Sequence, residues 1–209
     1  MSHANDEKTI EQMTAEIRAV NIEKGWRAAD GGLGLGNNTF GDYLALLHSE
    51  LSEALEAYRD HRLADATGKR KEIWTHATMC EAPIFQGYRP AKPEGVGSEF
   101  ADVLIRLFDT CDVIDVRPFE PDLALADVAP VKVRHLHSFG DWIAWLHRLV
   151  ANLGEIGLGP DPADAAYLLR ALVTAAEHFG IDLTAEYERK IAYNRTRPYQ
   201  HGGRTLADR

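Results

Sequence analysis

Apolar residues recur along this chain at intervals of three and four positions, which is the spacing of amphipathic helices. Polar stretches with glycine or proline separate the segments that show this pattern. The sequence therefore predicts an all-α fold. Its helices are expected over residues 7–25, 40–61, 98–114, 139–155, 163–179 and 183–198.

One of these segments occurs twice. Residues 139–155 (FGDWIAWLHRLVANLGE) match residues 40–56 (FGDYLALLHSELSEALE) in the same register, 99 positions later. Agreement at this many positions indicates an internal repeat. The helix that follows each copy would complete a helix pair. We therefore expect pairs at about 40–115 and 138–180, packed together as a four-helix core.

The whole chain, residues 1–209, is predicted to form a single domain. Residues 62–98 interrupt the first helix pair and contain three prolines, so they are predicted to be an insertion. Residues 28–39 hold four glycines and are predicted to be a loop. Their spacing fits neither a P-loop nor a dinucleotide-binding fingerprint.

The first helix pair carries two pairs of acidic residues, Glu50 with Glu53 and Glu99 with Asp102. A spacing of three positions puts both members of each pair on one side of a helix. Glu50 falls within the apolar arc of its helix, where a carboxylate without a partner costs several kcal/mol. For Glu99 and Asp102 the pattern also permits a solvated face, or acids that favour a helix N-terminus.

Packed face to face, the two helices would bring four carboxylates together. Such a group must be protonated, forced apart or neutralised by a cation, and oxygen ligands favour Mg²⁺, with Mn²⁺ as a substitute. We expect these acids to face the second helix pair, which lacks them. At the matching positions the second pair has Leu149, Asn152, Ala163 and Ala166.

Other residues are candidates for substrate contacts or for packing. Lys190, Asn194 and Arg197 share one face of the last predicted helix and could hold phosphate oxygens, although basic residues also complement a helix C-terminus. Trp26 could stack on a nucleotide base or lie in the core, and Trp74 is a competing candidate. His48 and His147 occupy the same position of the repeat, which favours a packing role.

Composition narrows the classes of partner. The net charge is −9, so a general nucleic-acid-binding surface is not expected. No apolar run approaches the length of a membrane span, and the first twenty residues show no signal-peptide pattern. The two cysteines, Cys80 and Cys111, fit no metal-binding or disulfide pattern, which favours a cytoplasmic location.

The acidic and basic motifs together carry a family resemblance. ExxE at 50–53, ExxD at 99–102 and K-x-x-x-N-x-x-R-P-x-x-H-G-G from Lys190 resemble the MazG-like branch of the all-α NTP pyrophosphatases. The degenerate repeat is similar to that of the dimeric dUTPases of the same superfamily. The resemblance implies an all-helical fold, Mg²⁺ dependence and hydrolysis of a nucleoside triphosphate to the monophosphate and pyrophosphate. It also implies a homodimer or a higher homo-oligomer.

The resemblance assigns roles by position. It implies that Glu50, Glu53, Glu99 and Asp102 bind the metal and that Lys190, Asn194 and Arg197 hold phosphates. Glu53 lies at the margin of the apolar arc, where water can reach it, and is our candidate for the general base.

Four other functions are possible alternatives to this one. Hydrolysis of phosphoribosyl-ATP would use the same fold, and a non-catalytic protein could use the acids to bind a magnesium–nucleotide complex. A di-iron bundle would need Glu-x-x-His pairs, and an HD-type phosphohydrolase would need an adjacent His-Asp. The chain contains neither, which disfavours both functions.

Overall fold

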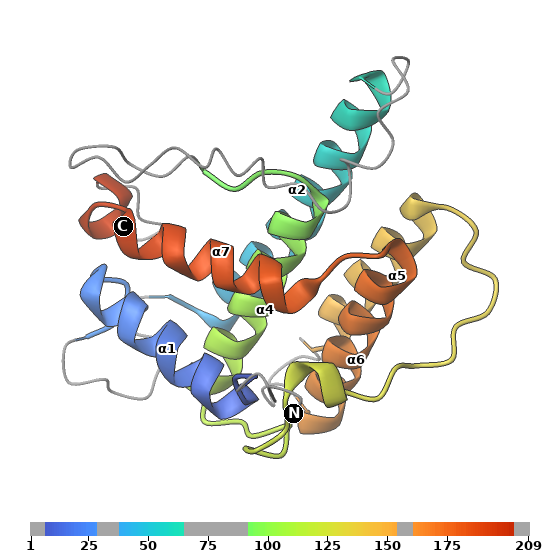
Figure 1. Ribbon diagram of the computed structural model, residues 1–209. Helices are drawn as coiled ribbons and strands as arrows, with labels where there is room; N and C mark the ends of the chain where they lie inside the picture. The colour runs from blue at the N-terminus through green and yellow to red at the C-terminus, as the bar shows by residue number, and fades with distance from the viewer. Residues whose placement is uncertain (1–6, 29–37, 65–91, 154–160, 203–209) are drawn as a thin grey trace, which may run out of the picture.

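The computed structural model describes residues 7–28, 38–64, 92–153 and 161–202 (Figure 1). These residues form six α-helices and no strand, apart from one isolated β-bridge between Thr9 and Ala124. The predicted all-α fold is therefore confirmed. The helices are α1 (Ile10–Glu23), α2 (Phe40–Ala64), α4 (Val96–Val113), α5 (Phe139–Asn152), α6 (Pro162–Phe179) and α7 (Leu183–Thr196).

Local sequence explains where several helices begin and end. Thr9 caps α1 and Ser138 caps α5, each in a reciprocal capping box with the residue three positions later. Asp161 caps α6, which ends at Gly180 in the left-handed conformation. A short 3-10 helix at Leu125–Asp127 lies between α4 and α5, and another at Tyr199–Gly202 follows α7. Most of the predicted insertion, and Trp74 within it, lies outside the described residues.

Helix α4 is the centre of the fold. It packs against α1, α2, α6 and α7 and runs through the middle of the molecule in Figure 1. Sixteen of its eighteen residues are buried, all except Asp102 and Arg106. The solvated face that its polar pattern permitted is therefore absent, because α1, α2 and α7 cover that side. Asp109 and Asp112 are among the buried residues.

The two copies of the repeat lie side by side, since α2 packs against α5. His48 and His147, at equivalent positions, meet at this contact, and their Nδ1 atoms are 2.8 Å apart. At that distance one ring donates a proton and the other accepts it. Partial burial lowers the pKa of both histidines, which favours this neutral pair. The expected packing role agrees with this contact.

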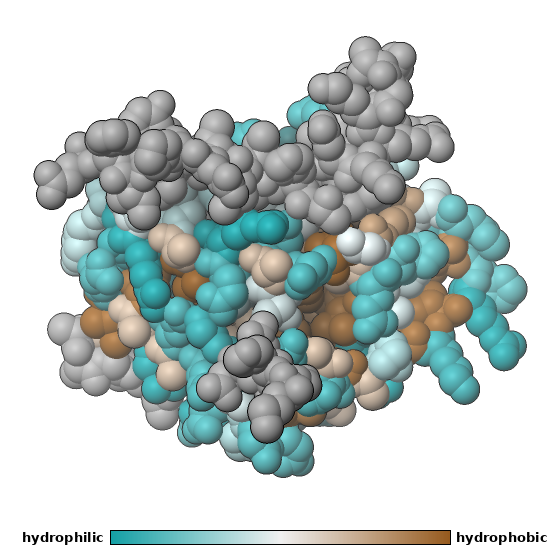
Figure 2. Space-filling view, viewed as in Figure 1, coloured by the Kyte–Doolittle hydropathy of each residue, from teal (hydrophilic) through white to brown (hydrophobic). Residues whose placement is uncertain are grey.

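The surface differs between the two sides of the molecule in the view of Figure 2. Hydrophobic residues gather over α5 and α6, on the right, whereas the side formed by α1 and α7 is mainly polar. Tyr167 of α6 is 41% exposed and contacts Trp145 of α5 edge to face. Among the described helices, none has the length and the apolar character needed to cross a membrane.

The segment that follows α7 is hydrogen-bonded to the turn at the end of α1. The backbone N–H of Gln200 donates to the carbonyl of Lys24 at 2.8 Å. Gly25 adopts a φ of +76°, and a Cβ atom there would lie 2.1 Å from the ring of Tyr199. Glycine is thus required both for the turn and for the close approach of Tyr199. This contact holds the chain that follows α7 near the turn that contains Trp26.

A buried carboxylate joins α1 to α4. The Asp112 side chain is 1% exposed and accepts hydrogen bonds from Arg18 Nε at 2.8 Å and from Arg27 Nη1 at 2.6 Å. Arg117 lies 3.5 Å away. Burial alone would raise the pKa of Asp112, but the bonds from Arg18 and Arg27 outweigh burial and lower it.

We predict that Asp112→Asn lowers the free energy of unfolding by roughly 2–4 kcal/mol, because it removes the buried charge that Arg18 and Arg27 share and leaves the buried Arg27 with Asp109 alone. Asp115→Asn is the matched control. Asp115 also pairs with Arg117, at 3.0 Å, but both side chains are more than half exposed. Its φ of +55° suits asparagine. The control should change stability by less than about 0.5 kcal/mol. Urea unfolding measures both, and equal effects would contradict this account of the α1–α4 contact.

Candidate metal centre

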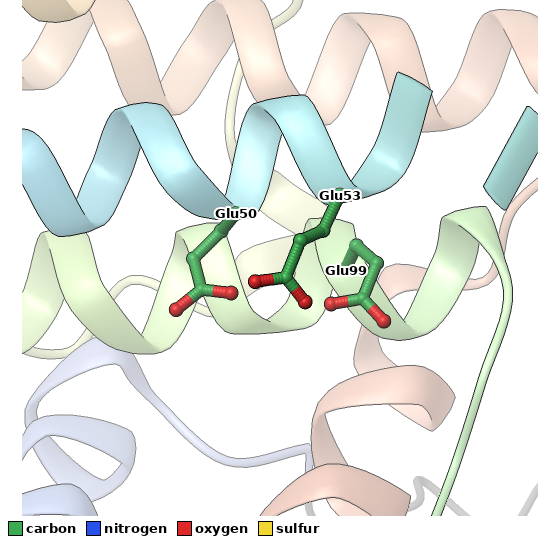
Figure 3. Close-up of side chains that lie close together, drawn as sticks. All are labelled: Glu50, Glu53 and Glu99. Atoms are coloured by element: carbon green, nitrogen blue, oxygen red, sulfur yellow. The ribbon is translucent and has the colours of Figure 1, made fainter. Parts of the chain in front are cut away.

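Three glutamates from two helices converge on one point. Glu50 and Glu53 project from α2 and Glu99 projects from α4, and Figure 3 shows their carboxylates on the same side. One oxygen of each lies within 4.8 Å of the others. The i, i+3 spacing on α2 aims two carboxylates in one direction, and the packing of α2 against α4 supplies the third. Three of the four predicted metal ligands are thus brought together.

Glu50 is buried, as its place in the apolar arc predicted. Its charge has one partner, because Arg106 Nε of α4 donates to Glu50 Oε1 at 3.2 Å. Burial, followed by the negative charge of Asp102, raises the pKa of Glu50, and Arg106 opposes that rise. Arg106 is not among the site residues that the sequence predicted, so this contact was missed.

Glu99 is the least satisfied of the three. Its side chain is 7% exposed, and its Oε2 atom has no hydrogen-bond partner among the described residues. Burial raises its pKa to about 7; the Lys190 ammonium, 4.0 Å away, opposes the rise and the Asp102 charge adds to it. Glu99 also lies in the first turn of α4, where an acid is favoured. A buried carboxylate oxygen without a donor is suited to a cation.

Glu53 differs from its two neighbours because it is exposed. The hydroxyl of Ser49 donates to its Oε1 at 3.4 Å, a long distance for a hydrogen bond. Water can therefore reach this carboxylate, as the margin of the apolar arc indicated. Its role as a general base stays a prediction.

Asp102 is held differently. It is not part of the convergent group, and its Oδ2 lies 2.5 Å from Lys190 Nζ of α7. The same ammonium donates to Ser98 Oγ at 2.8 Å, and Ser98 in turn donates to the carbonyl of Pro93 at 2.9 Å. Lys190 is 2% exposed, so its charge lies wholly inside the protein. The phosphate-binding role predicted for Lys190 is not tested by these contacts.

These ion pairs show what the acids face. We expected them to face the acid-free pair of α5 and α6, but Asp102 and Glu99 instead meet Lys190 of α7. The difference has a physical reason: α7 brings an ammonium group that offsets the buried charge, and no ion pair links these acids to α5 or α6 in the described part of the chain. Lys190 also lies one turn or more before the end of α7, so it does not complement that helix C-terminus.

The remaining candidates are on α7 and at the end of α1. Arg197 is the C-cap residue of α7, with its guanidinium 6.0 Å from the centre of the Tyr193 ring. Burial lowers the pKa of Arg197, and the charges of Asp102 and Glu50 act against that shift. The side-chain oxygen of Asn194 is buried and has no partner among the described residues. Trp26 is half-buried in the turn after α1, and its contact with a base stays a prediction.

The donor set fits a hard divalent cation. All of its atoms are carboxylate oxygens, which Mg²⁺ and Mn²⁺ prefer and which Zn²⁺ and copper sites seldom use alone. Neither histidine nor cysteine joins the group in the described part of the chain.

Comparisons of this chain with protein-family models, with curated proteins and with solved structures find no match. The likeness to MazG-like pyrophosphatases therefore rests on the motifs alone.

We predict that Glu99→Gln stabilises the metal-free protein at pH 8, by about 1–3 kcal/mol, because it removes a charge that burial disfavours. The folded pKa of about 7 exceeds the ordinary value of 4.5, so this carboxyl lowers stability progressively as the pH rises from 4.5 to 7. The advantage of the variant should therefore shrink as the pH falls toward 4.5. Urea unfolding in EDTA at several pH values measures it. A variant less stable than the parent at pH 8 would show that the carboxylate is satisfied.

Proposed function

We propose that this protein is a metal-dependent nucleoside triphosphate pyrophosphohydrolase of the MazG-like kind. It would hydrolyse nucleoside triphosphates, dNTPs above all, to the monophosphate and pyrophosphate. The proposed role is removal of unwanted nucleotides from the nucleotide pool. The observation that carries the proposal is the convergence of Glu50, Glu53 and Glu99, with one buried oxygen of Glu99 that has no hydrogen-bond partner among the described residues.

The chemistry divides among the residues as follows. A Mg²⁺ ion, or Mn²⁺ in its place, held by the acids would neutralise triphosphate oxygens. Glu53 is exposed and would accept a proton from the attacking water. The water oxygen bonds to the α-phosphorus, the bond from that phosphorus to the bridging oxygen breaks, and pyrophosphate leaves. Arg197 would stabilise the charge that develops on pyrophosphate.

Other parts of the proposal rest on the motif resemblance. It assigns Lys190 and Asn194 to the phosphates together with Arg197, and Asp102 to the metal together with the three glutamates. Trp26 is proposed to stack on the base. The same resemblance leads us to propose a homodimer or higher homo-oligomer that acts in the cytoplasm.

A second function is favoured by one observation. Lys190 and Arg106 already pair with three of the four acids inside the folded chain, Lys190 with Asp102 and Glu99 and Arg106 with Glu50, which a catalytic centre does not require. The protein would then bind a magnesium–nucleotide complex without turning it over.

The proposed activity predicts release of pyrophosphate from one or more nucleotides in a panel of canonical and modified NTPs and dNTPs, with phosphoribosyl-ATP included. Release should require Mg²⁺, stop in EDTA, and fall by at least about 100-fold in Glu50→Gln, because the metal loses a ligand. Coupled pyrophosphate detection and chromatography of the monophosphate measure the two products.

Glu56→Gln is the control, since Glu56 is an exposed acid on the same helix outside the cluster. It should retain full activity. Absence of turnover on every nucleotide, with folded protein and saturating metal, would contradict the pyrophosphohydrolase. Mg²⁺-dependent nucleotide binding under those conditions would then support the second function.

A further inference from the structure

The acid-rich end of α4 contains two cations that belong to the protein itself. Arg106 pairs with Glu50 at 3.2 Å, and Lys190 pairs with Asp102 at 2.5 Å. Lys190 is the more deeply placed, at 2% exposure, and its hydrogen bond to Ser98 fixes the position of the ammonium group. Asp102 and Lys190 together thus form a neutral unit beside the three glutamates.

The charges decide how many cations the site needs. Four carboxylates and two internal cations leave a net charge of −2 when all the acids are ionised, which one divalent cation neutralises. A second Mg²⁺ would leave the buried site with a surplus of positive charge, which is costly away from water. Within this site, Glu99 Oε2 is a buried carboxylate oxygen without a hydrogen-bond partner among the described residues, and it belongs to the glutamate group and not to Asp102.

We propose that the site binds a single divalent cation through Glu50, Glu53 and Glu99, and that Lys190 is an internal counterion that occupies Asp102 and takes the place of a second cation. Asp102 is then a positioning residue, because it holds the Lys190 ammonium at 2.5 Å, so that the second ion pair of that ammonium, with Glu99 Oε2, stays at the longer distance of 4.0 Å. This inference rests on the proposed metal-dependent function. It departs from the motif resemblance, which gives Asp102 to the metal and Lys190 to the phosphates.

A charge-pair role and a ligand role for Asp102 predict different results in a double-mutant cycle. If Asp102 restrains Lys190, Asp102→Asn frees the ammonium to turn onto Glu99, and metal binding weakens. Adding Lys190→Met removes that competitor, so binding should recover to within about threefold of the parent protein. If Asp102 is a ligand, the double variant stays as weak as Asp102→Asn, since the lost oxygen is not replaced.

The probe is Mn²⁺ alone, without nucleotide. Binding to the full chain is measured by the loss of the free Mn²⁺ electron paramagnetic resonance signal, which gives both the dissociation constant and the number of ions per chain. The parent protein should bind one Mn²⁺, and Glu53→Gln should weaken binding by at least about tenfold because it removes an exposed ligand. Circular dichroism checks that each variant is folded.

The outcomes separate this inference from the function on which it rests. Two Mn²⁺ ions per chain in the parent protein, or a double variant that fails to recover, would overturn the internal counterion while leaving metal-dependent activity intact. Failure of the parent protein to bind Mn²⁺ at millimolar concentration would overturn the metal centre and the proposed function together. Because the number of ions is read from the parent protein, the test holds even if Lys190→Met does not fold.

Discussion

The burial of α4 on every side is the constraint on which the rest of this structure depends. An amphipathic helix ordinarily keeps its charged residues in water, but α4 carries acids that the neighbouring helices cover. The helices that cover these acids must therefore supply charged partners. Helix α1 and the turn after it bring Arg18 and Arg27 to Asp112, and α7 brings Lys190 to Asp102. Helix α2 instead brings an acid, Glu50, to the one arginine of α4. These pairs tie the surrounding helices to α4 in defined positions.

Charge compensation is uneven along α4, and the unevenness locates the site. At the C-terminal end Asp112 meets two arginines at hydrogen-bond distance, so its carboxylate is more than balanced. At the N-terminal end the carboxylates outnumber the cations, and an oxygen of Glu99 is left without a donor. Buried ion pairs contribute little net stability, because desolvation offsets the attraction. The deficit at the N-terminal end therefore has no evident structural use, whereas a cation would remove it.

The sequence predicted the parts of this arrangement that depend on a single helix. Periodicity located the helices, and the place of Glu50 in an apolar arc signalled an acid that needs a partner. It could not show that the polar side of α4 is buried, because this depends on where α1 and α7 pack. For the same reason it missed the Arg106–Glu50 and Lys190–Asp102 pairs, whose members lie 56 and 88 positions apart. Contacts over such separations leave no periodic signal.

The internal repeat explains why the chain has one such site and not two. Helices α2 and α5 pack together with His48 against His147, so the two copies hold equivalent places at their contact. The acid-bearing copy is served by α7, whose Lys190 compensates the buried charge. The described part of the chain has no second helix that brings an ammonium to α5 and α6. Carboxylates on that pair would have been left uncompensated, and the residues there, such as Leu149 and Ala166, carry no charge to compensate. A buried carboxylate needs a compensating cation. The acid-bearing copy has one from α7, and the second copy, which α7 does not serve, carries no acids at the matching positions.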